Sequence, residues 1–169
     1  MKRASYYYYV EGDDEKSLLN ALKSDLGCIA SGRVEKFNPV QNRFTNARIR
    51  PLKVGTIVVL VYDTDVDTNI SILNDNVNFL RKHSGIKDVI CIPQVKNLED
   101  ELVDACEIKN IAELTKSGTK KEYKRDLISC SNLGARLKKC QFDIKKFWNK
   151  MPTNKFRDFG NDAEKVKLY

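Results

Sequence analysis

The sequence is poor in the residues on which many zinc and nucleophilic sites depend. It has one histidine, His83, and five cysteines that form no CxxC pair. A structural zinc site needs four suitably spaced sulfur or nitrogen ligands, and this chain lacks such a set. We interpret the scattered cysteines as small buried hydrophobic residues in a reducing compartment. The solitary histidine lies at a predicted helix end, which argues against histidine-based nucleophilic catalysis.

Long apolar runs are missing as well. No run approaches the roughly 18 residues that a membrane-spanning helix requires. The tyrosine-rich run at residues 6–10 is too short and too polar for the core of a signal peptide. We therefore expect a cytoplasmic protein with no membrane partner. The length of 169 residues is enough for about one domain with its own hydrophobic core.

Positive charge is concentrated in one part of the chain. Residues 116–157 contain 13 Lys and Arg against 3 Asp and Glu, whereas the remaining residues contain 17 against 20. A basic segment beside an acidic region suggests a polyanionic partner such as DNA or RNA, with a solvated helical surface as the alternative. The candidate contacts nearest the predicted core are Lys120, Lys121, Lys124 and Arg125.

Hydrophobic patterning predicts an α/β fold, with a mostly parallel central sheet and helices on both faces. The run TIVVLVY at 56–62 has no polar alternation, which is typical of a strand buried on both faces. Further strands are predicted at 4–10 and 87–93. Helices are predicted at 13–27, at 69–85 and from Asn97, which we expect to be an N-cap.

Two regions are harder to interpret. Residues 28–55 predict a second strand or a hairpin, followed by a loop that carries Arg43, Arg48 and Arg50. From about residue 107 the pattern is helical, including FDIKKFW at 142–148. The ordered core is expected to end near residue 150, with packing of Phe156 and Phe159 back onto it as the alternative. We therefore divide the chain into an α/β domain, 1–106, and a basic helical extension, 107–169, packed on it.

Acidic residues directly follow two of the predicted strands. Glu11 and Gly12 come after the first, with Gly12 expected to let the backbone turn away, and VYDTDVD places Asp63, Asp65 and Asp67 after the buried strand 56–62. In an extended backbone, alternate residues project to one side. Clustered carboxylates repel one another unless a cation compensates, and oxygen ligands suit Mg²⁺ or Mn²⁺. Ligands of open α/β sheets bind beyond the carboxyl ends of the strands.

Simpler explanations exist for some of these acids. Asp13 and Asp14 precede a predicted helix, and we interpret both as residues that favour a helix start. For Asp67 two interpretations stay open: a metal ligand, or a residue that favours the start of the next helix. A calcium-binding EF loop from Asp63 is excluded, because the positions that need Gly and Glu hold Thr68 and Asn74.

The two acidic motifs together resemble those of the Toprim domain. VEGDDE matches its Glu-Gly motif, YDTDVDTN matches its DxDxD motif, and the likeness covers roughly residues 4–105. The domain is shared by topoisomerases, bacterial primases, RecR proteins, ribosomal-RNA maturases and OLD-family nucleases. KNLEDEL at 96–102 also resembles an acidic element of OLD-family nucleases, which would make Glu99 a further ligand, unless it only starts a helix.

The resemblance implies a function as well as a fold. Asp63 and Asp65 would hold Mg²⁺ with Asp67 as an auxiliary ligand, and Glu11 would complete the metal site or act as a general acid or base. This predicts a small Toprim nuclease acting on DNA or RNA, with bacterial or phage defence as a biological role. The alternatives are a non-catalytic nucleic-acid or nucleotide-binding module that serves a protein partner, and an RNA-processing maturase.

Overall fold

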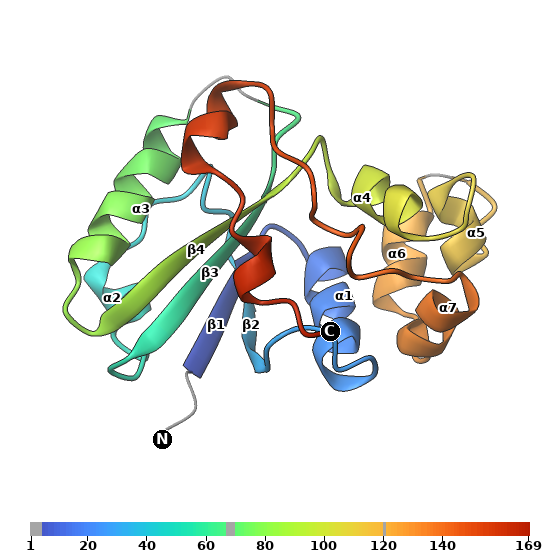
Figure 1. Ribbon diagram of the computed structural model, residues 1–169, viewed down its shortest axis with the longest axis horizontal. Coiled ribbons are helices and arrows are strands. Elements are labelled where there is room, and N and C mark those ends of the chain that lie inside the picture. Colours follow the sequence, from blue (N-terminus) through green and yellow to red (C-terminus); the bar gives the residue numbers. More distant parts are fainter. Residues whose placement is uncertain (1–4, 67–69, 120) are drawn as a thin grey trace.

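The computed structural model describes residues 5–66, 70–119 and 121–169. Its centre is a four-stranded sheet in which every neighbouring pair is parallel (Figure 1). The order across the sheet is β2 (Gly32–Lys36), β1 (Ser5–Val10), β3 (Thr56–Asp63) and β4 (Ile86–Gln94). The predicted α/β fold with a parallel sheet is confirmed. Of the two interpretations of residues 28–55, the strand is correct and the hairpin is wrong, because β2 pairs parallel to β1.

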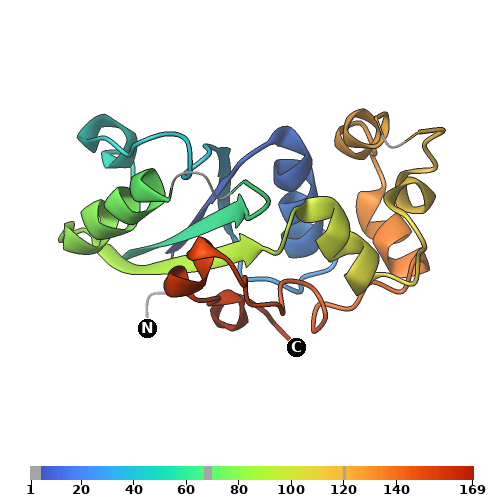
Figure 2. The same ribbon diagram turned by 90° about the horizontal axis from the view of Figure 1, so that it is seen from above.

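Helices cover both faces of the sheet. Figures 1 and 2 show α2 and α3 on one face, and α1 on the other with α4 to α7 beyond it. The helical elements are α1 (Asp13–Ser24), α2 (Asn46–Ile49), α3 (Ser71–Lys82), α4 (Leu98–Ala105), α5 (Ile111–Thr115), α6 (Tyr123–Ile128), α7 (Leu133–Lys139), and the 3₁₀ helices η1 (Lys155–Phe159) and η2 (Ala163–Lys165). Within the described residues, no helix is both long and apolar enough to cross a bilayer.

Strand β3 is buried on both faces of the sheet, which explains why helices pack on both sides. Its residues from Thr56 to Tyr62 are all buried, and they alternate between two hydrophobic clusters. Val59 and Val61 pack in the cluster that contains the leucines of α1, whereas Val58 and Leu60 pack in the cluster that contains those of α3. Alternation along a strand places successive side chains on opposite faces. A continuous apolar run is therefore the sequence of a central strand.

The extension and the C-terminal tail share this core. Leu127 and Leu137 pack in the same cluster as the α1 leucines. The expected helix at 142–148 is absent: these residues form turns, and Trp148 has a φ of 55°. The expected end of the ordered core near residue 150 is also wrong. Phe156 is fully buried against Tyr62, and the backbone N–H of Asp162 donates to the Cys91 carbonyl at 2.9 Å, so the tail covers the edge of β4.

Candidate functional site

The carboxyl ends of β1 and β3 bring two of the predicted site residues together. Glu11 Oε1 accepts a hydrogen bond from the backbone N–H of Asp63 at 3.2 Å. Burial, reinforced by the charges of Glu15 and Asp65, raises the pKa of Glu11 to about 7. Burial and the charge of Glu11 raise the pKa of Asp63 to about 8. The pair therefore carries negative charge only at a free-energy cost.

Asp65 lines the same cavity as these two residues. The cavity has a volume of about 330 Å³ and is bordered by Glu11, Asp63 and Asp65 on one side and by the loop after β2 on the other. Asp65 is exposed, so it faces solvent at the mouth of the cavity. The predicted ligand Asp67 lies outside the described residues.

The first turn of α1 adds two acids to the site: Asp14, which lies at the helix start as predicted, and Glu15, which the sequence analysis did not name. Asp14 and Glu15 are only 4% and 3% exposed. Burial, a hydrogen bond with Asp14 and the charges of Asp14 and Asp63 raise the pKa of Glu15. Glu15 Oε2 is buried without a hydrogen-bond partner. A sequence signal for Glu15 existed, since it shares the helical face of Leu18 and Leu22 and thus places an acid on an apolar stripe.

Gly12 makes room for these acids. Its backbone is extended, with φ of −137°, a conformation that any residue adopts. The chain bends at Glu11 and Gly12, but the bend does not depend on the conformational freedom of glycine. A Cβ at this position would lie 2.5 Å from Asp14 Oδ1 and 2.8 Å from Glu15 Oε2. The absence of a side chain lets the carboxylates lie against the end of β1.

The geometry distinguishes among the three acids at the start of α4. Glu101 is fully buried, and it accepts hydrogen bonds from the backbone N–H groups of Val95 and Trp148, each at 2.9 Å. Asp100 lies 3.9 Å from Lys96 in an exposed ion pair. Of the three, Glu99 is the acid whose charge is among the causes that raise the pKa of Asp63. Glu99 lines a separate cavity with Asn97 and Tyr123, whereas Glu101 belongs to the core.

Lys124 is the candidate basic residue that faces the acids. Its Nζ lies 3.6 Å from Asp14 Oδ2. Partial burial opposes protonation of Lys124, but the charges of Asp14, Glu99, Glu15 and Asp63 outweigh it and raise its pKa. The other candidates are placed differently. Arg125 pairs with Asp126 and Glu122 of its own region, Lys121 is exposed, and Lys120 lies outside the described residues.

A buried amide connects Asp63 to the extension. Gln94, the last residue of β4, is fully buried and donates from Nε2 to Asp63 Oδ1 at 2.6 Å. Its Oε1 accepts from the Trp148 indole N–H at 3.4 Å. The hydrogen bond from Gln94 favours the charged form of Asp63 and opposes the rise in its pKa. Nothing in the sequence pattern pointed to this contact, which joins residues 54 positions apart.

The donor chemistry of the site fits a hard divalent cation. Every candidate ligand is a carboxylate, the acids raise one another's pKa, and a buried oxygen of Glu15 has no hydrogen-bond partner. Within the ranges that the structure describes, no three acidic, histidine or cysteine side chains form a ready-made metal-binding group. A cation at this site would therefore draw the carboxylates closer together.

Comparisons with known proteins do not identify a family for this chain, so its site is interpreted from the geometry alone. The chain matches no protein-family model, no curated protein is significantly similar to it, and no solved structure matches it significantly.

Proposed function

We propose that this protein is a metal-dependent phosphodiesterase that cleaves nucleic acid and that its α/β domain is Toprim-like. The observation that carries the proposal is the convergence of acids from β1, α1 and β3 at one edge of a parallel sheet. Burial and the mutual repulsion of these acids raise the pKa values of Glu11 and Asp63, and a bound cation would relieve the cost of charging them. The resemblance of the two motifs to the Toprim domain supports the same conclusion.

Mg²⁺ or Mn²⁺ would be held by Glu11, Asp63 and Asp65, with Asp67 as a further ligand. Such a cation neutralises charge on the phosphodiester and activates water as a nucleophile. The charge of Asp63 raises the pKa of Glu15, and the charge of Glu99 raises the pKa of Asp63, which makes Glu15 and Glu99 the candidate ligands of a second ion. Gln94 keeps Asp63 oriented toward the site through its 2.6 Å hydrogen bond.

Lys124 supplies positive charge from the extension. Its side chain is 58% exposed, so the ammonium group can move from Asp14 to a phosphate oxygen that enters the site. A cation placed beside the transferring phosphoryl group stabilises charge that develops in the transition state. The net charge of +7 and the basic segment support a polyanionic substrate. We accordingly assign nucleic acid as the substrate class.

The proposal is tested by incubating the purified protein with labelled single- and double-stranded DNA and RNA in Mg²⁺, Mn²⁺ or EDTA. We expect cleavage that requires the metal and that falls at least about a hundredfold in Glu11→Gln and in Asp63→Asn, because each removes a charged ligand. Equal cleavage by wild type and both variants would show that the activity does not come from this site.

The main alternative is a binding module without catalysis, which serves a partner protein. It is favoured by one observation, that the described acids are not already arranged as a complete metal-binding group. Tight, salt-sensitive binding of nucleic acid without cleavage in any metal would support this alternative and overturn the nuclease proposal.

A further inference from the structure

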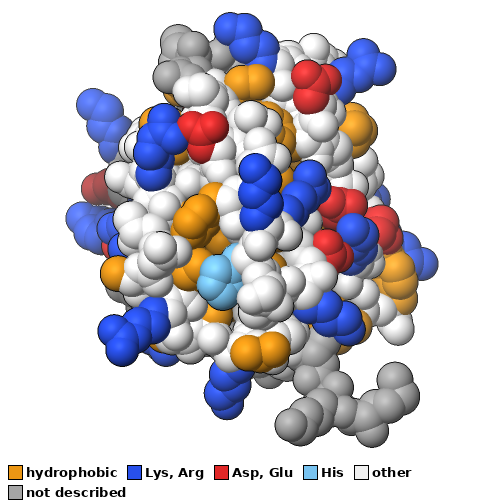
Figure 3. Space-filling view, turned by 90° about the vertical axis from the view of Figure 1, so that its left-hand side faces the viewer, with side chains coloured by type: hydrophobic (Ala, Val, Ile, Leu, Met, Phe, Trp, Pro, Cys, Tyr) orange, Lys and Arg blue, Asp and Glu red, His pale blue; other side chains and the backbone are white. Residues whose placement is uncertain are grey.

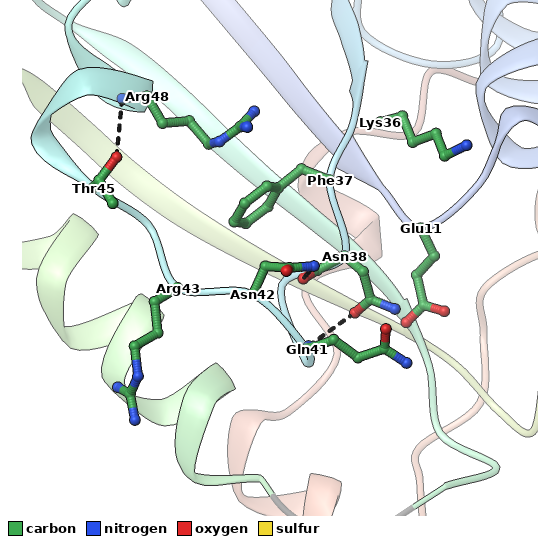
Figure 4. Close-up of a pocket in the computed structure, with 9 residues that line it drawn as sticks. All are labelled: Glu11, Lys36, Phe37, Asn38, Gln41, Asn42, Arg43, Thr45 and Arg48. Carbon is green, nitrogen blue, oxygen red and sulfur yellow. Dashed lines mark hydrogen bonds between the residues drawn. The ribbon is translucent and has the colours of Figure 1, made fainter.

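A second pocket lies directly beside the carboxylate cavity. It has a volume of about 600 Å³ and shares Glu11, Asn38 and Gln41 with the cavity of about 330 Å³. Figure 4 shows the side chains of Asn38 and Gln41 facing the Glu11 carboxyl, with Arg43 and Arg48 farther along the pocket. A ligand bound in this pocket would therefore be able to extend directly into the carboxylate cavity.

The lining of the pocket consists mainly of amides and cations. Among the described residues that line it, Glu11 is the only acid, beside three amide side chains and three cations. The cations pair with acids that do not line the pocket. The Lys36–Asp13 and Arg43–Asp75 pairs are more than half exposed, and exposed ion pairs of this kind contribute about 0–1 kcal/mol each. An entering phosphate can therefore replace these partners at low cost.

The Asn38 side chain and the backbone of the loop that follows it are held in place before any ligand binds. Asn38 Oδ1 accepts from the backbone N–H groups of Val40 and Gln41 at 2.9 and 3.1 Å, which leaves its NH₂ group as a donor toward the pocket. The buried Asn76 of α3 joins this loop to the helix. Its Nδ2 donates to the Asn42 carbonyl at 2.7 Å and its Oδ1 accepts from the Phe44 N–H at 2.7 Å.

Packed aromatic rings support the loop that lines the pocket. Phe37 is 8% exposed and packs against Phe44 with ring centroids 4.4 Å apart. The Arg48 guanidinium lies over the Phe37 ring at 4.5 Å, and Arg48 Nη1 donates to Glu35 at 2.6 Å. The planar guanidinium is thus fixed along the wall of the pocket. Nucleic-acid bases stack on guanidinium planes of this kind.

The size and chemistry of the pocket select its occupant. A pocket of about 300–1,000 Å³ holds one drug-sized ligand, a range that includes a single nucleotide. In a duplex the Watson–Crick edge of a base is already paired and only its groove edges are open, so a pocket that takes up a whole base needs that base to be unpaired and unstacked. We propose that this pocket binds one unpaired nucleotide of the substrate strand, adjacent to the phosphodiester at the carboxylate cavity. That the nucleotide belongs to a nucleic-acid substrate rests on the proposed nuclease function, but its binding in the pocket does not require cleavage.

The test measures binding without catalysis. Fluorescence anisotropy in EDTA would compare single-stranded oligonucleotides of about 10 nucleotides with duplexes of the same sequence. We expect single strands to bind more tightly, and we expect Gln41→Ala and Arg43→Ala each to weaken that binding about tenfold. Arg43→Ala should also reduce the dependence of log K on log salt by about one.

Arg81→Ala is the matched control. Arg81 is an exposed arginine in the last turn of α3, outside the pocket lining. Figure 3 shows that Lys and Arg side chains on the side of the molecule where α3 lies are scattered among acids, with no continuous basic surface. Arg81→Ala should therefore bind oligonucleotides as the wild type does.

Nucleoside monophosphates should compete only at concentrations far above those of the oligonucleotide.

Several results would overturn the pocket assignment. These are a wild type that binds no oligonucleotide, binding unchanged in both pocket variants, equal affinity for duplex and single strand, and equal competition by free mononucleotides. The proposed function fails separately. A protein that binds single strands through Gln41 and Arg43 but never cleaves them would retain the pocket and lose the nuclease activity.

Discussion

Two groups of buried acids in this molecule differ in how their charge is stabilised. Glu101 is fully buried, and its two oxygens accept hydrogen bonds from two backbone N–H groups. Glu11, Glu15 and Asp63 are crowded together, repel one another and have fewer hydrogen-bond donors. Burial of an acid therefore does not by itself indicate a functional site. Burial combined with mutual repulsion and incomplete hydrogen bonding does.

The largest expected effect on stability comes from the well-bonded acid. Glu101→Ala removes the acceptor of both the Val95 and the Trp148 N–H groups, and each unsatisfied buried donor costs about 1–3 kcal/mol. We expect the free energy of unfolding, measured in urea at pH 7, to fall by about 3 kcal/mol. A loss below about 1 kcal/mol would remove the distinction between the two groups of acids.

Lys124 tests whether the crowded acids act on a phosphate. Lys124→Ala should lower kcat of metal-dependent cleavage about tenfold or more, because it removes the cation that faces the acids. Lys138→Ala, at an exposed position of α7, provides the matched control and should leave kcat unchanged. Similar losses in both variants would indicate a general effect of net charge instead of a local role for Lys124.

The crowded acids should destabilise the metal-free fold at high pH. A carboxyl group whose pKa is raised in the folded state binds protons more tightly than in the unfolded chain, so stability falls as pH rises from the unfolded pKa to the folded pKa. For Asp63 this window runs from about 4 to about 8. In EDTA, Asp63→Asn should therefore raise the melting temperature by about 3 °C at pH 8.5, an effect that disappears toward pH 4. A uniform destabilisation across this range would contradict the assignment.

The smallest expected effect comes from Gln94, which hydrogen-bonds both to Asp63 and to Trp148, the residue whose backbone N–H is accepted by Glu101. Gln94→Leu removes the hydrogen bond that favours the charged form of Asp63, so the pKa of Asp63 should rise further. The pH at which Mg²⁺-dependent cleavage reaches half its maximum should move upward, with kcat at high pH reduced less than tenfold. Gln94→Glu, which places another acid beside Asp63, should shift the profile in the same direction. An unchanged pH profile in Gln94→Leu would show that this residue only fills space.

Sequence patterns predicted strands β1, β3 and β4 and located the two acidic motifs, but they left β2 open between a strand and a hairpin. The apolar run at 56–62 predicted a doubly buried strand, and Asn97 was predicted as the N-cap of α4, where its side chain accepts from the Asp100 N–H. The turns at 142–148 were not predictable from local pattern, because they are held by a long-range contact: Trp148, with a φ of 55°, donates its backbone N–H to Glu101 of α4, 47 positions earlier. Local propensity cannot anticipate a conformation that a long-range hydrogen bond selects.

The amino-acid sequence by itself determined which strands are buried and that acids follow two of them, since both properties depend on neighbours along the chain. Only the tertiary structure decided which acids share a site. Parallel pairing of β1 and β3 brings Glu11 to the backbone of Asp63, and the packing of α6 brings Lys124 to Asp14. Electrostatic interaction depends on separation in space and on burial, and both are set by packing between segments that are far apart in the chain.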